Sequence, residues 1–287
     1  MWKVAAASVA GRMHLDAGAR CQDAHAWACE GPWLVAAVSD GAGIAARARE
    51  GAEHGVRHLV ASIATALAQD PQSEPTAAAL RPRVADAIRE LRASLTSAEP
   101  SDPDAILDYA ATILGIVVGP AGGLFFHIGD GMGLAFGTGE GATQHTSHPE
   151  NGAHPWETYF FTDPDWEAHL RFTDTDPEVD QVLLMTDGAV AMVSDPPAGM
   201  ASRAFVTRFM RTCSIWLESA RIVSSPGASS VRSSISSPMT RCRSRSKRRR
   251  VSFTPMGRGL MVCLRLNERR LWVSAAARPA DASIWSI

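Results

Sequence analysis

Three Asp-Gly steps stand at the ends of apolar runs, and their carboxylates are the side chains of this chain best suited to chemistry. The steps are Asp40-Gly41 in VAAVSDGAG, Asp130-Gly131 in LFFHIGDGMG and Asp187-Gly188 in VLLMTDGAV. Each run has the composition of a buried strand, so each acid follows directly after a strand end. Gathered in one place, these carboxylates would form a cluster of oxygen ligands suited to a hard divalent cation.

An Asp-Gly step is also ordinary turn chemistry, and a single one would be interpreted as a turn. Three of them at strand ends favour the cation site, because a hairpin turn would not need the long helical insert that follows Asp40. A fourth acid, Asp23 in GARCQDAHAW, precedes a short apolar segment upstream of the first step. The four acids are therefore the candidate ligands.

Helices and strands must position these acids. Apolar residues at helical spacing predict helices over 45–69 and 76–98, and two long helices after a pair of strands suit a layer that covers a sheet. The polar stretch 138–181 has little periodicity and is expected to be a long functional connection or flap. A further helix is predicted over 204–219. Strands are expected over 3–9, 34–39, 112–118, 123–128, 133–137, 182–186 and 259–266, with the PAGG segment at 120–123 as a hairpin turn.

Composition places the chain among cytoplasmic globular proteins. The 287 residues are 46% hydrophobic, which is enough for a sizeable core, and the net charge of -2 gives no overall attraction to nucleic acid or to membranes. The first residues resemble a strand more than a secretory signal, and no apolar run approaches the roughly 20 residues of a membrane span. An odd number of scattered cysteines indicates a reducing compartment. They are Cys21, Cys29, Cys213, Cys242 and Cys263.

The C-terminal part differs from the rest in composition. Residues 220–255 are dominated by Ser and Arg, lack apolar periodicity and are predicted to be disordered. No acid occurs between Glu218 and Glu268. We therefore expect three segments: a folded domain over 1–219, a disordered segment over 220–258, and a C-terminal extension over 259–287 with one residual strand.

The ordered set GARCQDAH, VSDGAG, HIGDGMGLAF and LLMTDGAV resembles the metal-dependent Ser/Thr protein phosphatases of the type-2C class. The stretch HPENGAHPWETYFFTDPDW resembles the linker of a bacterial subgroup of that class. The resemblance spans roughly residues 3–195. It implies an α+β fold, a four-layer αββα sandwich of two antiparallel sheets flanked by helices. It also implies a signalling hydrolase with two Mg or Mn ions at one edge of the sheets, where an activated water attacks phosphorus directly.

The resemblance assigns a role to each candidate residue. Asp40 matches the acid that bridges both ions, and Gly41 matches the residue that offers a backbone carbonyl to one of them. Asp23 and Asp187 match further ligands, so that Asp23, Asp40 and Asp187 are the expected catalytic acids. Asp130 matches an acid that in some members helps to hold a third, weaker ion, although a structural turn role fits it equally well.

The residue that grips phosphate is left open by the sequence. Arg12, His14 and Arg20 compete for the place of an arginine that many members carry. Arg20 lies closest to Asp23 and offers the bidentate fork that phosphate prefers. His14 belongs to the GRMH step, which occupies the position of the family's Gly-x-x-Arg.

Three departures from the family pattern bear on activity. Ala42 replaces a common His, and Ala191 stands where an acid for the third ion is often found. The largest departure precedes the last strand, where the family has an acidic pair that supplies a ligand and this chain has TPMGR. Loss of that carboxylate should weaken one ion. A frame change in the gene after residue 200 and a divergent tail are the two explanations.

Three functional hypotheses follow. The first is a protein phosphatase of reduced activity, which acts on a phosphorylated protein substrate opposite a cognate Ser/Thr kinase. The second is an inactive pseudo-phosphatase that binds phosphoproteins. The third, and least favoured, is nucleic-acid binding through the basic tail segment RCRSRSKRRR.

Overall fold

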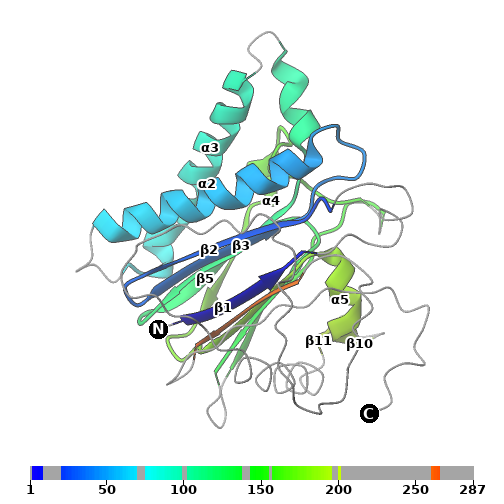
Figure 1. Cartoon of the computed structure of the whole chain (residues 1–287). Helices are drawn as coiled ribbons and strands as arrows, with labels where there is room; N and C mark the ends of the chain where they lie inside the picture. Colours follow the sequence, from blue (N-terminus) through cyan, green and yellow to red (C-terminus); the bar gives the residue numbers. More distant parts are fainter. Residues whose placement is uncertain are drawn as a thin grey trace, which may run out of the picture.

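Two five-stranded antiparallel sheets pack face to face in the computed structural model, and helices cover the outer face of one of them (Figure 1). The structure describes residues 2–8, 21–69, 75–98, 102–137, 143–154, 157–195, 200–201 and 260–265. The helix expected over 204–219 and the segment expected to be disordered over 220–258 lie outside the described residues.

Sheet I is built mainly from strands that are neighbours in sequence. Its order is β2-β3-β4-β5-β8, and every pairing is antiparallel. The predicted hairpin between β4 and β5 is confirmed, because Gly119 pairs with Gly122 across a two-residue turn and Gly122 has φ +102°. The strands are β2 Ala24–Glu30, β3 Trp33–Ser39, β4 Ile113–Gly119, β5 Gly122–Ile128 and β8 Arg171–Thr175.

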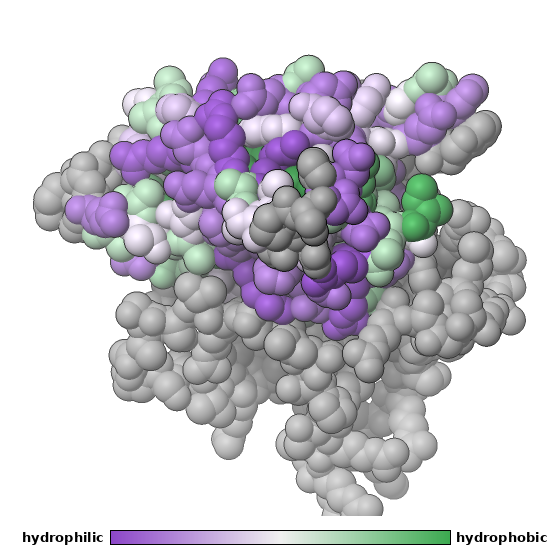
Figure 2. All heavy atoms as spheres, turned by 90° about the horizontal axis from the view of Figure 1, so that it is seen from above, coloured by the Kyte–Doolittle hydropathy of each residue, from purple (hydrophilic) through white to green (hydrophobic). Residues whose placement is uncertain are grey.

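Two long helices, α2 (Ala48–Gln69) and α3 (Ala77–Ala98), confirm the helical spacing and cover sheet I (Figure 1). Their apolar stripes pack with the outer face of β3, β4 and β5 in one hydrophobic cluster. The 3-10 helix η1 (Pro103–Tyr109) leads from α3 to β4, capped by the side chain of Asp102. Seen from the α3 side, the described surface is mostly hydrophilic (Figure 2).

Sheet II combines strands from distant parts of the chain, in the order β1-β12-β9-β6-β7. The strand β12 lies between β1 and β9, antiparallel to both. The predicted strand over 259–266 is therefore confirmed as an interior strand of a sheet. The bounds are β1 Trp2–Ala7, β6 Met132–Phe136, β7 Gln144–Ser147, β9 Gln181–Met185 and β12 Leu260–Arg265.

The main core lies between the two sheets. It holds Leu34 and Ile116 from sheet I against Leu134 and Leu184 from sheet II, all fully buried, with Phe125 of β5 among them. The helix α5 (Asp187–Val193) begins at the end of β9 and buries Ala189 against this cluster. A two-residue ladder, β10 (Ser194–Asp195) with β11 (Met200–Ala201), follows α5.

The expectation of an α+β sandwich of two antiparallel sheets flanked by helices is confirmed. The expectation of a long polar connection over 138–181 is wrong, because this stretch contains β7, the short helix α4 (Trp166–His169) and β8. The strands β7 and β8 lie at sheet edges and carry polar residues, so they lack the alternation of apolar and polar residues by which a strand is recognised in a sequence. Within the described residues, no helix is long and apolar enough to cross a membrane.

Candidate active site

Asp23 and Asp40 lie opposite each other at one end of sheet I. The last paired residues of β2 and β3 are Ala24 and Ser39, so the two acids come directly after that pair in the antiparallel register. The antiparallel pairing continues beyond this last pair, since the N–H of Gly41 donates to the carbonyl of Gln22 at 3.3 Å. The register of a single hairpin thus brings together two of the acids that the sequence singles out.

Thr112, which directly precedes β4, joins this pair to the next acid. Its hydroxyl accepts a hydrogen bond from the N–H of Asp40 at 3.0 Å, and its own N–H donates to the Asp40 carbonyl at 2.9 Å. Its Cγ2 packs on Gly129, where a Cβ would lie only 2.6 Å away and where φ is +119°. Glycine is required at this turn, and Asp130 follows it.

Asp130 and Asp187 form the second pair, at the corresponding end of sheet II. The strands β6 and β9 pair from Met132 opposite Met185, which places Asp130 and Asp187 two residues beyond the same end of the ladder. Gly131 contacts the Met185 backbone so closely that a Cβ would approach its carbonyl oxygen to 2.6 Å. Asp187 also begins α5.

The four acids therefore stand at one edge of the facing sheets, as two pairs joined through Thr112 and Gly129. Within the part of the chain that the structure describes, no three His, Cys, Asp or Glu side chains are close enough together to hold an ion. The structure thus places the predicted ligands at a common edge without closing them into one cluster. His14 and Arg20, the candidate phosphate-binding residues, lie outside the described residues.

The electrostatic potential around Asp23 and Asp40, the acid pair of sheet I, is negative. The thiol of Cys21 donates to Asp23 Oδ2 at 3.3 Å. Its pKa is raised to about 12, first by burial and then by the charges of Asp23 and Asp40. A thiol with this pKa stays protonated at neutral pH and is not a nucleophile, so Cys21 does not serve as a cysteine-phosphatase nucleophile. The same negative potential and oxygen donors suit a divalent cation.

Two positioning contacts were not predicted from the sequence. Thr112 gives no sequence signal beyond its place before a buried strand. Arg49 of α2 donates from Nη1 to the Cys21 carbonyl at 3.0 Å, which fixes the backbone just before Asp23, and its Nη2 is 2.9 Å from Glu53. An arginine in a helix is common, so nothing in the sequence separates Arg49 from its neighbours.

The fold is an α+β sandwich of two antiparallel sheets with acids at one edge, and sequence comparison identifies the family. The family model described as "Protein phosphatase 2C" matches residues 10–221, well over half of the chain. The chain belongs to the protein phosphatase 2C family, and its enzyme class is protein-serine/threonine phosphatase.

Known proteins resemble this chain to different degrees. Serine/threonine-protein phosphatase 3 of Escherichia coli (strain K12) is 29% identical over 205 residues, which cover 68% of this chain and 78% of that protein. A solved bacterial serine phosphatase aligns with a TM-score of 0.48 at 11% identity, covering 73% of this chain and 85% of that one. The serine/threonine phosphatase Stp1 of Staphylococcus aureus aligns with a TM-score of 0.47 at 12% identity, covering 74% and 89%.

Proposed function

We propose that this protein hydrolyses phosphoserine and phosphothreonine in protein substrates, with two Mg or Mn ions held at the acid-lined edge. The observation that carries the proposal is that two pairs of strands end in acids, Asp23 with Asp40 and Asp130 with Asp187, at the same edge of the two sheets. Carboxylate and carbonyl oxygens are the donors that these hard cations prefer.

Each donor has a distinct part in the proposal. Asp23, Asp40, Asp187 and the Gly41 carbonyl would hold the two ions, with Asp40 shared between them. Asp130 would hold a third, weaker ion. When bound, the ions supply a water of lowered pKa as the nucleophile and neutralise the phosphate oxygens. The carboxylates hold the ions in place, and Thr112 fixes the backbone of Asp40.

The start of β12 bears on how active the enzyme is. Leu260 pairs with Met185, two residues before Asp187, so β12 begins near the acid-lined edge. The sequence before it, TPMGRG, contains no acid, whereas the family places a ligand there. We therefore propose that turnover is reduced. The same observation favours the second candidate, a pseudo-phosphatase that binds phosphoproteins without hydrolysis.

The proposal extends to partners and location. A cognate Ser/Thr kinase would supply the phosphorylated protein substrate, and we place both in the cytoplasm. Arg20 and His14 remain the proposed phosphate-binding residues. Nucleic-acid binding by the basic tail stays the least favoured alternative, and a salt-sensitive shift of DNA on a gel would support it.

Asp40→Ala provides the first test. Calorimetric titration with Mn should show affinity at least about tenfold weaker than in the wild type, the lower range for perturbed metal sites. Hydrolysis of p-nitrophenyl phosphate should require Mn or Mg and cease with EDTA. Asp86→Ala is the matched control, because Asp86 is an exposed acid on α3 that pairs with Arg89.

The outcomes separate the candidate functions. Equal Mn affinity in Asp40→Ala and Asp86→Ala would refute the metal assignment. Hydrolysis that persists in chelator would require a different nucleophile. Intact Mn binding with no turnover in the wild type would establish the pseudo-phosphatase.

A further inference from the structure

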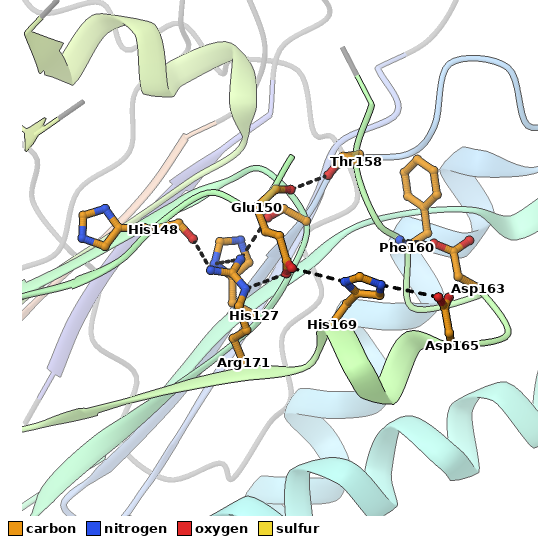
Figure 3. A network of polar contacts seen from close by, with 10 residues as sticks. His127, His148, Glu150, Thr158, Phe160, Asp163, Asp165, His169 and Arg171 are labelled. Carbon is orange, nitrogen blue, oxygen red and sulfur yellow. Dashed lines mark hydrogen bonds and ion pairs between the residues drawn. The ribbon is translucent and has the colours of Figure 1, made fainter. Parts of the chain in front are cut away.

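A single guanidinium, that of Arg171, contacts four groups next to the Gly129–Asp130 turn. Arg171 is the first residue of β8, and its side chain is about two-thirds buried, with 33% exposed. Figure 3 shows the contacts. The Arg171 Nη1 donates to the His148 carbonyl at 2.7 Å, and the Arg171 Nε is 2.7 Å from Glu150 Oε2. The Arg171 Nη2 donates to the Gly129 carbonyl at 3.3 Å and lies 3.4 Å from His127 Nδ1.

Glu150 is held in place independently of Arg171. Its N–H donates to the Gly129 carbonyl at 2.8 Å, and its own carbonyl accepts from the Thr158 hydroxyl. Its other carboxylate oxygen lies 3.2 Å from His169 Nδ1, and His169 stacks on Tyr159 with ring centroids 3.4 Å apart. Glu150 therefore presents a fixed carboxylate to Arg171.

His127 is the buried member of the network around Arg171. It is fully buried on β5, and its pKa lies well below 6.5, first because of burial and then because of Arg171 and His148. Its Nδ1 lies 3.0 Å from the Ser147 hydroxyl and 3.4 Å from Arg171 Nη2. Because a guanidinium can only donate, Nδ1 is assigned as the acceptor and the ring proton is assigned to Nε2. A neutral acceptor is what allows a guanidinium to lie beside it.

The Gly129 carbonyl is the meeting point of these contacts. It accepts two N–H groups, from the Glu150 backbone and from Arg171, and Gly129 also packs on Thr112. Asp130 is the next residue, so the direction of its side chain depends on the peptide whose carbonyl is held. Two hydrogen bonds to one carbonyl fix that peptide plane more firmly than one.

We infer that Arg171 is a positioning residue for Asp130: by clamping the Gly129 carbonyl, it orients the acid toward the ion that Asp130 holds. The inference rests on the proposed function, since it needs Asp130 as a ligand. Conformational fixing is the role that best fits the network, because a buried ion pair contributes little net stability compared with apolar packing. The Arg81–Asp174 pair, which also joins an arginine to a residue in β8, is exposed and serves as a comparison.

The test compares Arg171→Gln with Arg81→Gln in the full-length protein. Arg171→Gln should raise the Mn concentration for half-maximal hydrolysis of p-nitrophenyl phosphate by about three- to tenfold and lower kcat, with KM for the phosphate ester unchanged. The upper value meets the lower limit of the roughly 10- to 100-fold losses seen when outer-shell partners of a metal are removed, and the smaller values are expected because Asp130 holds the weaker ion. Arg81→Gln should match the wild type. Glu150→Gln, which keeps the side-chain shape, should shift half-activation in the same direction and covers the case in which Arg171→Gln does not fold.

The decisive measurement is a double-mutant cycle with Asp130→Asn. If Arg171 acts through Asp130, then Arg171→Gln adds no further shift in Mn half-activation once Asp130 is changed. Additive shifts would overturn the inference, and so would an Asp130→Asn protein with wild-type Mn dependence.

Failure of the proposed function is distinguishable from failure of this inference. A wild type without metal-dependent hydrolysis refutes the phosphatase proposal, and the same cycle is then measured by calorimetric titration with Mn alone. An active, Mn-dependent wild type whose Arg171→Gln and Glu150→Gln variants both match it refutes only the role of Arg171.

Discussion

The two sheets differ in how the chain builds them, although each contributes a pair of acids to the same edge. In sheet I, β2 and β3 form one hairpin and β4 and β5 another, and long helices cover the outer face. In sheet II, the interior strand β12 comes from residues 260–265, whereas its partners β1 and β9 end at Ala7 and Met185. Sheet I is thus largely a local structure, and sheet II depends on a strand from far along the chain.

The different origins of the strands in the two sheets indicate which part of the candidate site is more sensitive to mutation. Asp23 and Asp40 are positioned by the β2–β3 hairpin and by Thr112, and neither contact involves the C-terminal part of the chain. Asp187 follows β9, which pairs with β6 on one side and with β12 on the other. A change at the C-terminal end of the chain should therefore disturb the sheet II pair of acids before the sheet I pair.

The largest expected effect comes from removing β12. Truncation after Ser219 would detach β1 from sheet II and expose an edge of β9, so we expect loss of cooperative unfolding, a cost comparable to the whole stability of a domain, about 5–15 kcal/mol. Deletion of residues 220–255 alone should preserve the melting transition, because this Ser- and Arg-rich segment can bury little. Circular dichroism melts of the two proteins make the comparison, and equal melting temperatures would contradict it.

The second comparison places a methyl group in each sheet. A Cβ on Gly115 of β4 would lie 2.0 Å from the Phe126 ring, and one on Gly133 of β6 would lie 2.7 Å from the Phe125 ring. Overpacking of this kind costs about 1–3 kcal/mol. We expect Gly115→Ala to be the more destabilising of the two in urea unfolding. A larger loss of stability in Gly133→Ala than in Gly115→Ala would show that the core around Gly115 relaxes more readily than the short distance indicates.

The smallest effect concerns pH at the contact between the sheets, where His127 of β5 meets Ser147 of β7. The folded-state pKa of His127 is well below 6.5, because the ring is buried and faces Arg171 and His148. The unfolded chain therefore binds a proton that the folded chain excludes. Stability from this group is fully present above a pH of about 6.5 and is lost as the pH falls, by at most about 1.4 kcal/mol per pH unit.

His127→Gln should flatten that part of the pH dependence. Urea unfolding of the wild type and the variant, measured between a pH of about 7.5 and about 5, isolates the histidine, because other titrating groups are common to both. Parallel curves would show that His127 is protonated in the folded state.

Long periodic elements could be predicted from the sequence, and short polar ones could not. The helices α2 and α3 and the strands β3, β4, β5 and β9 have continuous apolar patterns. The strand β7 (QHTS) and the four-residue helix α4 (WEAH) have none, because an edge strand and a single helical turn need little apolar surface.

The candidate site divides in the same way. The strand ends before Asp40, Asp130 and Asp187 were predictable because each acid ends an apolar run, whereas the role of these acids as ligands stays a prediction. Thr112 and Arg171 were not, because their roles arise from contacts between segments far apart in sequence, such as the 3.3 Å contact of Arg171 with Gly129. His14 and Arg20 lie outside the described residues and stay predictions.

The interior place of β12 has a consequence for synthesis on the ribosome. Sheet I can form once the chain has emerged through β8, but β1 and β9 must wait for residues 260–265 before they gain the strand between them. During that interval two strands with apolar neighbours expose unpaired backbone, which is the condition that favours mispairing between nascent chains. The sheet II half of the candidate site therefore forms later than the sheet I half, and yields of folded protein should respond to chaperone supply and to growth temperature.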